Sequence, residues 1–190
     1  SDTPGPLILT LLGSSDSNLV PNNPINLSLS GTGPQYTLNI RPSADLNGTT
    51  IITLAVQNVD GVIVTNSFQL NVLPVNDAPS VQTVLNQITD EDTPLLNLGF
   101  TMSDIDSPTA TLVVTADSDN LGLIRPQDIT FTGQGTATPT VTLNPRQDQF
   151  GSAVITLTVT DGLLPTTTTF LLTVDPINDV PTIRQILDIT

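Results

Sequence analysis

Short acidic clusters recur along this chain and are the residues best suited to chemistry. They comprise Asp90-Glu91-Asp92, the pair Asp104 and Asp106, the single residues Asp148 and Asp161, and Asn76-Asp77 with its later copy Asn178-Asp179. Calcium takes six to eight oxygen ligands, mainly carboxylates and carbonyls, which must converge from separate loops. Carboxylates gathered this closely repel one another unless a cation neutralises them. The pattern therefore predicts that the chain binds calcium.

The composition argues against several other functions. The chain has 18 acidic residues against four basic ones, a net charge of -14. A nucleic acid would meet a repelling surface, so we expect no nucleic-acid partner. The chain contains no Cys, His, Trp or Lys, which removes most nucleophiles, the usual general base and most transition-metal ligands. We therefore expect no enzymatic activity.

The hydropathy pattern shows neither a membrane-spanning segment nor a signal peptide. No apolar run approaches the length of about 18 residues that a membrane-spanning helix needs, and the first residues lack the basic lead of a signal peptide. We expect no membrane insertion. A secreted domain without disulfides must be stabilised by its core or by ions.

An internal repeat organises the chain. The segment PVNDAPSVQTVLNQIT at 74–89 recurs as PINDVPTIRQILDIT at 176–190, which places Asn178 102 positions after Asn76. Asp45 and Asp148 keep nearly the same period, as do Asp60 and Asp161. We predict a β-sandwich at 1–78 that lacks its first strands, a complete β-sandwich at 79–180, and at 181–190 the start of a further repeat or an exchanged strand.

The segments between the acidic clusters have the pattern of strands. TATLVVTA at 109–116, PTVTLNP at 139–145 and SAVITLTVT at 152–160 are rich in β-branched residues. In the last of these, Ala153, Ile155, Leu157 and Val159 alternate with Val154, Thr156 and Thr158, so one face is apolar. Turn clusters follow about every ten residues, and no helical periodicity is present. An all-β fold of two tandem immunoglobulin-like Greek-key sandwiches is predicted.

These motifs together resemble the cadherin-like repeats of large bacterial surface proteins. The resemblance rests on Asp104-Ile105-Asp106, on Asp148 ahead of AVITLTVTDG, on Asp161-Gly162 and on the PxND-x-P strings, and it covers nearly all of the chain. It implies calcium at the junctions between consecutive repeats, with extracellular, secreted or cell-surface location. Neighbouring repeats of the same protein are the implied partners.

The resemblance also assigns ligands at each junction. At the first it implies Asp45, Asn76, Asp77, Asp104, Asp106 and Asp161. At the second it implies Glu91 or Asp92, together with Asp148, Asp175, Asn178 and Asp179. The sequence departs from the family at two points, since Asp148 stands in the shorter string RQDQFG and Leu73 occupies the position that Asp175 holds in the second linker.

Each acid also has a simpler interpretation, because Asp caps turns without any metal. We interpret Asp16, Asp117, Asp119 and Asp128 as turn or solubility residues. Asn76 could equally satisfy backbone donors through an Asx turn.

The leading functional hypothesis is an extracellular structural repeat, a calcium-rigidified spacer of a surface adhesin or filament. One alternative is a fibre subunit that joins copies of itself by head-to-tail docking or strand exchange, with the strand around 183–189 completing another molecule. The other is a glycan-binding adhesin module, against which we expect most Phe residues to face the core. The sequons at Asn26 and Asn47 could carry glycans.

Overall fold

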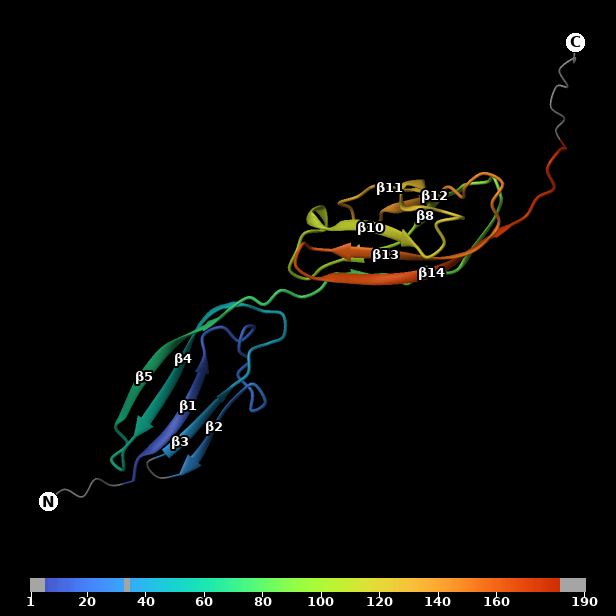
Figure 1. Ribbon diagram of the computed structural model, residues 1–190. Helices are drawn as coiled ribbons and strands as arrows, with labels where there is room; N and C mark the ends of the chain where they lie inside the picture. The colour runs from blue at the N-terminus through green and yellow to red at the C-terminus, as the bar shows by residue number, and fades with distance from the viewer. Residues whose placement is uncertain (1–5, 33–34, 182–190) are drawn as a thin grey trace, which may run out of the picture. The chain divides into compact units, whose positions relative to one another are not determined.

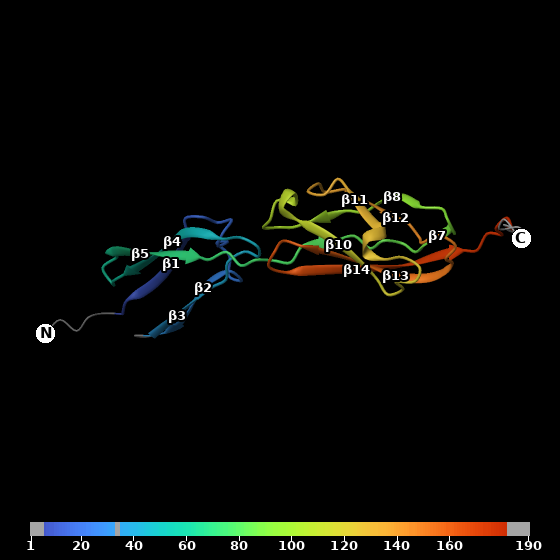
Figure 2. The ribbon, with the colours of Figure 1, turned by 45° about the horizontal axis from the view of Figure 1, so that its top comes forward.

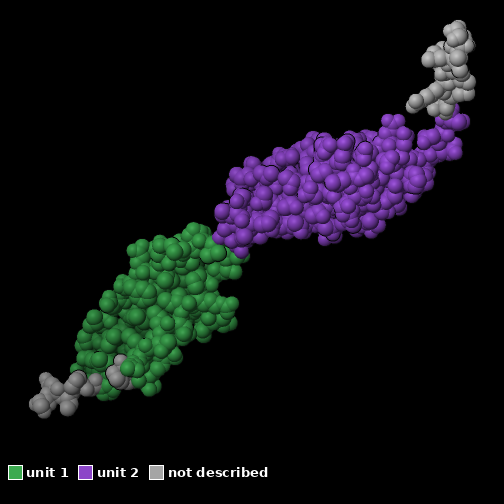
Figure 3. Space-filling view, in the orientation of Figure 1, with its two compact units in different colours: residues 1–75 green, residues 76–190 purple. Residues whose placement is uncertain are grey.

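The computed structural model describes residues 6–32 and 35–181. It divides the chain into two compact units, unit 1 at residues 1–75 and unit 2 at residues 76–190 (Figure 3). Unit 2 therefore begins with the linker residues Asn76 and Asp77, whereas the repeat pattern placed them at the end of the first sandwich. Residues 182–190, which hold most of the predicted further repeat or exchanged strand, lie outside the described residues.

The described residues of unit 2 form nine strands and two short 3-10 turns, and Figure 1 shows how the longer strands lie. The strands are β6 (Ser80–Val81), β7 (Gln87–Asp90), β8 (Leu95–Gly99), β9 (Met102–Ser103), β10 (Val113–Ser118), β11 (Ile129–Thr132), β12 (Thr140–Leu143), β13 (Gly151–Thr160) and β14 (Pro165–Asp175). The turns are η1 (Thr109–Thr111) and η2 (Pro126–Asp128).

These strands form two main sheets with a shared core. One sheet has the order β10-β13-β14-β7 and the other β11-β12-β8, while β6 pairs with β9. All pairs are antiparallel except β7, which runs parallel to β14 along its outer edge. Seventeen buried apolar side chains fill the space between the layers, including Ile155, Leu157 and Leu172, which are fully shielded from solvent.

Strand β13 shows the predicted alternation. Ala153, Ile155, Leu157 and Val159 are all buried, and the residues between them are exposed or half-buried. The all-β prediction is confirmed, with one local correction at 109–116. There the strand begins only at Val113, because the chain after Pro108 turns through η1, where the Thr111 and Leu112 amides donate to the Pro108 and Thr109 carbonyls.

Residues 6–32 and 35–75, the described part of unit 1, form five strands in two layers. Figure 2 shows the two layers as separate groups. They are β1 (Ile8–Ser14), β2 (Leu27–Thr32), β3 (Gln35–Ile40), β4 (Gly48–Gln57) and β5 (Ile63–Val72). The sheet order is β1-β4-β5, with β2-β3 as a hairpin. Its core is small, because only Leu19, Val20, Leu27 and Ile52 form the buried cluster.

The two units correspond strand by strand over the last five strands of unit 2. Gly48 pairs with Val72 as Gly151 pairs with Val174, so β4 matches β13 and β5 matches β14. By the same logic β1 matches β10, β2 matches β11 and β3 matches β12. The described residues of unit 1 contain no counterparts of β6 to β9. Consequently β5 and β3 are edge strands in unit 1.

The turns that precede β4 and β13 share a backbone conformation that the sequence repeats. Asp45 and Asp148 have φ of 58° and 55°, in the left-handed region that Asp tolerates better than most residues. Three residues later Gly48 and Gly151 have φ of 139° and 126°, which favours glycine. The two aspartates are thus equivalent in conformation as well as in sequence.

The expectation that most Phe side chains face the core is confirmed for three of the five. Phe100 and Phe170 are buried, and Phe131 packs against the core with its ring at right angles to that of Phe100. Phe68 and Phe150 are 41% and 61% exposed. Phe68 lies on β5, beyond which the described residues of unit 1 place no further strand, and Phe150 lies in the turn just before β13.

Helices contribute almost nothing to the described part of the chain. None there is long and apolar enough to cross a membrane.

The unequal cores predict unequal responses to the same substitution. Leu157 is fully buried in β13, whereas its counterpart Leu54 in β4 is only partly buried. Leu157→Ala should lower the free energy of unfolding of unit 2 by about 2 to 5 kcal/mol, and Leu54→Ala should cost unit 1 clearly less. Urea unfolding followed by circular dichroism measures both. Equal losses would contradict the difference in packing described here.

Candidate metal sites

Two groups of acidic side chains lie at opposite ends of β14 in unit 2. The entry cluster, on the side of the turn between β13 and β14, comprises Asn76, Asp77, Asp104, Asp106 and Asp161. The exit cluster, beyond the other end of β14, comprises Asp92, Asp148 and Asp179. Together they contain eight of the twelve predicted ligands.

Asp161 anchors the entry cluster. One of its oxygens, Oδ1, accepts hydrogen bonds from the Leu163 and Leu164 amides at 2.7 Å, and Oδ2 accepts one from Asn76 Nδ2 at 2.7 Å. These donors favour the charged carboxylate. The Leu164 amide, then the Asn76 side chain and the Leu163 amide, hold the pKa of Asp161 below its ordinary value.

Asp106 fixes the same linker at a second point. Its Oδ2 accepts a hydrogen bond of 2.6 Å from the Asp77 amide. Asn76 Nδ2 also donates to the Asp77 carbonyl at 2.9 Å, so the Asn-Asp step is folded back on itself. The chain entering unit 2 is therefore tied to the β13-β14 turn and to the loop after β9.

Asp104 contributes a carboxylate oxygen to the entry cluster that no described protein group contacts by a hydrogen bond. Its Oδ1 accepts from the Asp106 and Ser107 amides at 2.8 Å, which closes an Asx turn. Its Oδ2 is shielded from solvent, yet the described residues give it no hydrogen-bond partner. A buried carboxylate oxygen without a donor is costly, and a cation would satisfy it.

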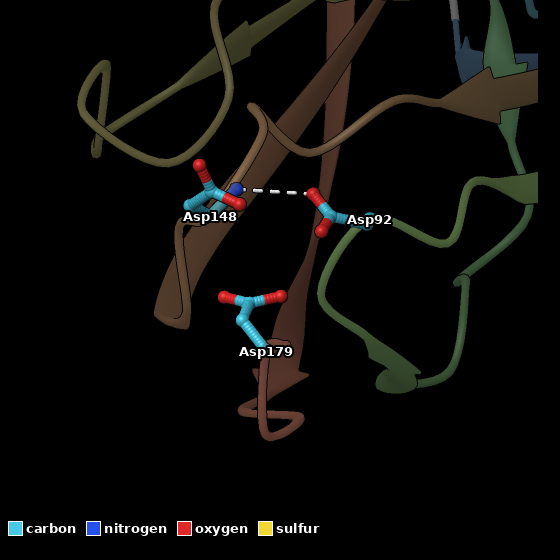
Figure 4. A group of neighbouring side chains, drawn as sticks. All are labelled: Asp92, Asp148 and Asp179. Carbon is cyan, nitrogen blue, oxygen red and sulfur yellow. Dashed lines mark hydrogen bonds between the residues drawn. The ribbon is translucent and has the colours of Figure 1, made fainter. Parts of the chain in front are cut away.

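The exit cluster brings three carboxylates together directly. Asp92, Asp148 and Asp179 each place a carboxylate oxygen within 4.8 Å of the others, and all three side chains are exposed. Figure 4 shows them facing one another from the turn after β7, the turn before β13 and the segment after β14. Among the described residues they are the one such group.

Backbone geometry holds two of these aspartates in place. Asp92 and Asp148 have φ of 59° and 55°. The Asp148 amide donates to Asp92 Oδ1 at 3.0 Å, which links the two turns. The one ion pair among the described residues joins Arg125 to Asp128, so no arginine there neutralises these three charges.

Glu91 has a different position from its neighbour Asp92. It is 5% exposed, its Oε1 accepts from the Ile177 amide at 2.6 Å, and its own amide donates to the Asp175 carbonyl at 2.8 Å. It thereby fixes the segment that carries Asp179. Asn178 Nδ2 donates to the Asp179 carbonyl at 3.1 Å, which repeats the contact between Asn76 and Asp77.

The remaining predicted residues fall outside both groups. The Asp175 carboxylate lies at the end of β14 and does not belong to the exit group, and Asp45 lies in unit 1. Asn26 is half-buried and its Nδ2 donates to the Arg41 carbonyl at 2.9 Å, whereas Asn47 is exposed. The glycosylation of both stays a prediction.

The aspartates interpreted as turn residues mostly have that role. Asp16 accepts from the Asn18 and Leu19 amides, and Asp119 accepts from the Val154 amide. Asp128 pairs with the Arg125 guanidinium, which lowers the pKa of Asp128 and raises that of Arg125. Asp117 is exposed on β10. None of the four joins the exit group.

Comparison with solved structures identifies the fold. The extracellular cadherin domains 3–6 of protocadherin gamma B2 match with a TM-score of 0.60 and 11% identity over 92% of this chain and 41% of theirs. PcdhgB3 EC1-4 matches at 0.59 and 12% over 90% of this chain and 41% of its own. Human mucin-like protocadherin EC1-2 matches at 0.52 and 19% over 90% and 85%. The chain has the cadherin-type β-sandwich fold.

No protein-family model matches the sequence, and no curated protein matches it. The chain spans less than half of the protocadherin gamma B2 chain and about a quarter of two endo-fucoidan hydrolase chains, which match with TM-scores of only 0.40. The likeness therefore describes the fold alone.

The Asp161 contacts predict a dependence of stability on pH. The pKa of Asp161 is lower in the folded chain than its ordinary value of 3.8, so the unfolded chain takes up this proton first as the pH falls. The stabilisation is complete above the ordinary pKa and is lost as the pH falls through the folded-state pKa. Asp161→Asn should lower the free energy of unfolding of unit 2 at pH 7, because an amide cannot accept from all three donors. It should also reduce the fall in this free energy at acidic pH. Urea unfolding between pH 2 and 7 measures both effects. If the variant loses as much stability at acidic pH as the unmodified chain, the prediction is wrong.

Proposed function

We propose that this chain is an extracellular, non-enzymatic repeat module whose clusters bind calcium and thereby stiffen the segments that enter and leave unit 2. The observation that carries the proposal is the exit cluster, three carboxylates within 4.8 Å of one another with no arginine paired to them among the described residues. The fold is that of cadherin ectodomains, which supports a role as a spacer in a surface adhesin or filament.

The donor set fits calcium by its chemistry. Calcium accepts carboxylates in mono- or bidentate fashion and tolerates flexible geometry, whereas magnesium demands a near-ideal octahedron and zinc favours nitrogen and sulfur ligands. Asp92, Asp148 and Asp179 would hold the ion at the exit cluster. At the entry cluster Asp104 would hold it through the oxygen that has no donor. A bound ion supplies positive charge where the fold gathers negative charge.

Stiffening follows from which segments carry the ligands. Asp179 belongs to the chain that leaves β14, and the other two exit residues belong to turns of the sandwich body. One ion bound by all three would tie the departing segment to the body of unit 2. Without the ion, charge repulsion favours its release. At the entry side, Asn76 and Asp77 are already tied to the body by hydrogen bonds.

Calcium should therefore stabilise the folded chain. Extracellular modules bind calcium with Kd of about 10⁻⁴ to 10⁻³ M, so 10 mM calcium should add roughly 1.4 to 2.7 kcal/mol by mass action. The melting temperature measured with calcium should exceed that measured in EGTA by several degrees. Asp92→Asn/Asp148→Asn should lose the part of this increase that the exit cluster supplies and keep the part that the entry cluster supplies.

The matched control is Asp117→Asn/Asp119→Asn, which likewise removes two negative charges, from exposed positions outside both clusters. It should retain the calcium effect. If the control loses as much of the calcium-dependent rise in melting temperature, the rise comes from general screening of net charge. If calcium does not raise the melting temperature of the unmodified chain, the proposal is wrong.

The entry cluster makes a separate prediction. Asp104→Asn keeps an oxygen at Oδ1 to accept the Asp106 and Ser107 amides, and it places an amide nitrogen at the buried Oδ2 position. Calcium binding at the entry cluster should be lost while the exit cluster still binds. Isothermal titration should show fewer bound ions per chain. Asp119→Asn, which likewise keeps its backbone contact to Val154, is the control and should leave the number unchanged.

A further inference from the structure

Glu91 is the one glutamate among the 18 acidic residues of the chain, and its side chain is buried. The two aspartates beside it, Asp90 and Asp92, are both exposed. Glu91 is not a member of the three-carboxylate exit cluster. A buried carboxylate is costly unless a donor satisfies it, and the donor here is the Ile177 amide at 2.6 Å. The role of Glu91 must therefore be sought in that contact.

The contact continues the parallel pairing of β7 with β14 beyond the ends of both strands. Asp90 pairs with Asp175 at the last position of the ladder, and the Glu91 amide then donates to the Asp175 carbonyl at 2.8 Å. After this point the backbone turns away from β14, because Asp92 has φ of 59° and the Thr93 amide donates to the Asp90 carbonyl at 3.2 Å. The Glu91 side chain thus supplies the acceptor that a further strand residue would have supplied.

The segment that leaves β14, residues 176–181, has little else to hold it in place. All six residues are exposed, so no buried side chain anchors the segment. Among the described residues, the bond from the Ile177 amide to Glu91 is the one hydrogen bond that joins the segment to the sandwich. The bond from the Asn178 side chain to the Asp179 carbonyl lies within the segment. The position of Asp179 therefore depends on the Glu91 carboxylate.

The segment that enters unit 2 is held differently, because two side chains of the sandwich contact it. The Asn76 side chain donates to Asp161, and the Asp77 amide donates to Asp106. If either bond is lost, the other remains. A single substitution should therefore release the exit segment but not the entry segment.

We propose that Glu91 is a positioning residue rather than a calcium ligand, and that its carboxylate holds Asp179 at the exit cluster before any ion binds. The inference rests on the proposed function, because it concerns the calcium affinity of that cluster. The hydrogen bond opposes the repulsion between Asp179 and the other two carboxylates. An ion then meets three ligands already in place. Without the bond, the apparent affinity falls by the fraction of chains whose segment remains in position.

Two substitutions at this position separate the hydrogen bond from the charge. Glu91→Gln removes the charge but keeps an oxygen at the same reach, which can accept from the Ile177 amide. Glu91→Asp keeps the charge but is one methylene shorter, so it loses the bond. We expect Glu91→Gln to bind calcium nearly as well as the unmodified residue and Glu91→Asp to bind it about tenfold more weakly. A calcium ligand would show the reverse order, because calcium affinity depends on the number of charged ligands.

Isothermal titration with calcium measures these affinities in the Asp104→Asn chain, in which the exit cluster alone is expected to bind. Ile177→Pro removes the same hydrogen bond from its other side, because proline has no amide hydrogen, and it should weaken binding as much as Glu91→Asp does. The two substitutions together should weaken binding no further. Val180→Pro is the matched control and should leave the affinity unchanged, because Val180 is exposed and the described residues give its amide no acceptor.

Hydrogen exchange in EGTA, followed by NMR, tests the hydrogen bond without calcium. The Ile177 amide should be protected in the unmodified chain and in Glu91→Gln, and it should exchange about tenfold faster or more in Glu91→Asp. The Leu157 amide of β13 should stay protected in all three chains, which shows that unit 2 remains folded.

Two results would overturn the proposal: an unprotected Ile177 amide in the unmodified chain, or weaker calcium binding by Glu91→Gln than by Glu91→Asp. A third result separates it from the proposed function. If the Ile177 amide is protected as expected and the Asp104→Asn chain binds no calcium, the calcium assignment of the exit cluster is wrong and the hold of Glu91 on the segment is confirmed.

Discussion

Repulsion between carboxylates that the fold holds together is the constraint on which the rest of this structure depends. The core of unit 2 fixes β13 and β14, and β7 pairs with β14. These strands set the positions of the turns and the departing segment that carry Asp92, Asp148 and Asp179. The hydrogen bond from the Asp148 amide to Asp92 Oδ1 holds the Asp92 side chain beside the turn that carries Asp148. A cation removes the repulsion without disturbing the sandwich.

The linkers show how one local motif serves both ends of the unit. In each, an Asn side chain donates to the carbonyl of the following Asp, so the Asn-Asp step has the same local contact at 76–77 and at 178–179. The entry copy is further tied to Asp161 and Asp106, while Glu91 fixes the exit copy through the Ile177 amide. Adjacent acids therefore have different roles. Glu91 accepts a hydrogen bond from the backbone, whereas Asp92 contributes its carboxylate to the exit cluster.

The sequence predicted the sandwich because its signals are local. The alternation in β13 and the 102-residue period need only neighbouring residues and their copy. The members of the exit cluster were harder to predict, because Glu91 and Asp92 are adjacent in the sequence and only the burial of Glu91 distinguishes the two. The buried oxygen of Asp104 and the exposure of Phe68 depend on which surfaces are covered, and that information lies in tertiary packing.

The most direct test of the central claim is a crystal structure of the whole chain grown in calcium. We expect an ion with oxygens of Asp92, Asp148 and Asp179 at about 2.3 to 2.6 Å, the distances typical of calcium. Carboxylates that point apart in the presence of calcium, with no ion between them, would contradict it.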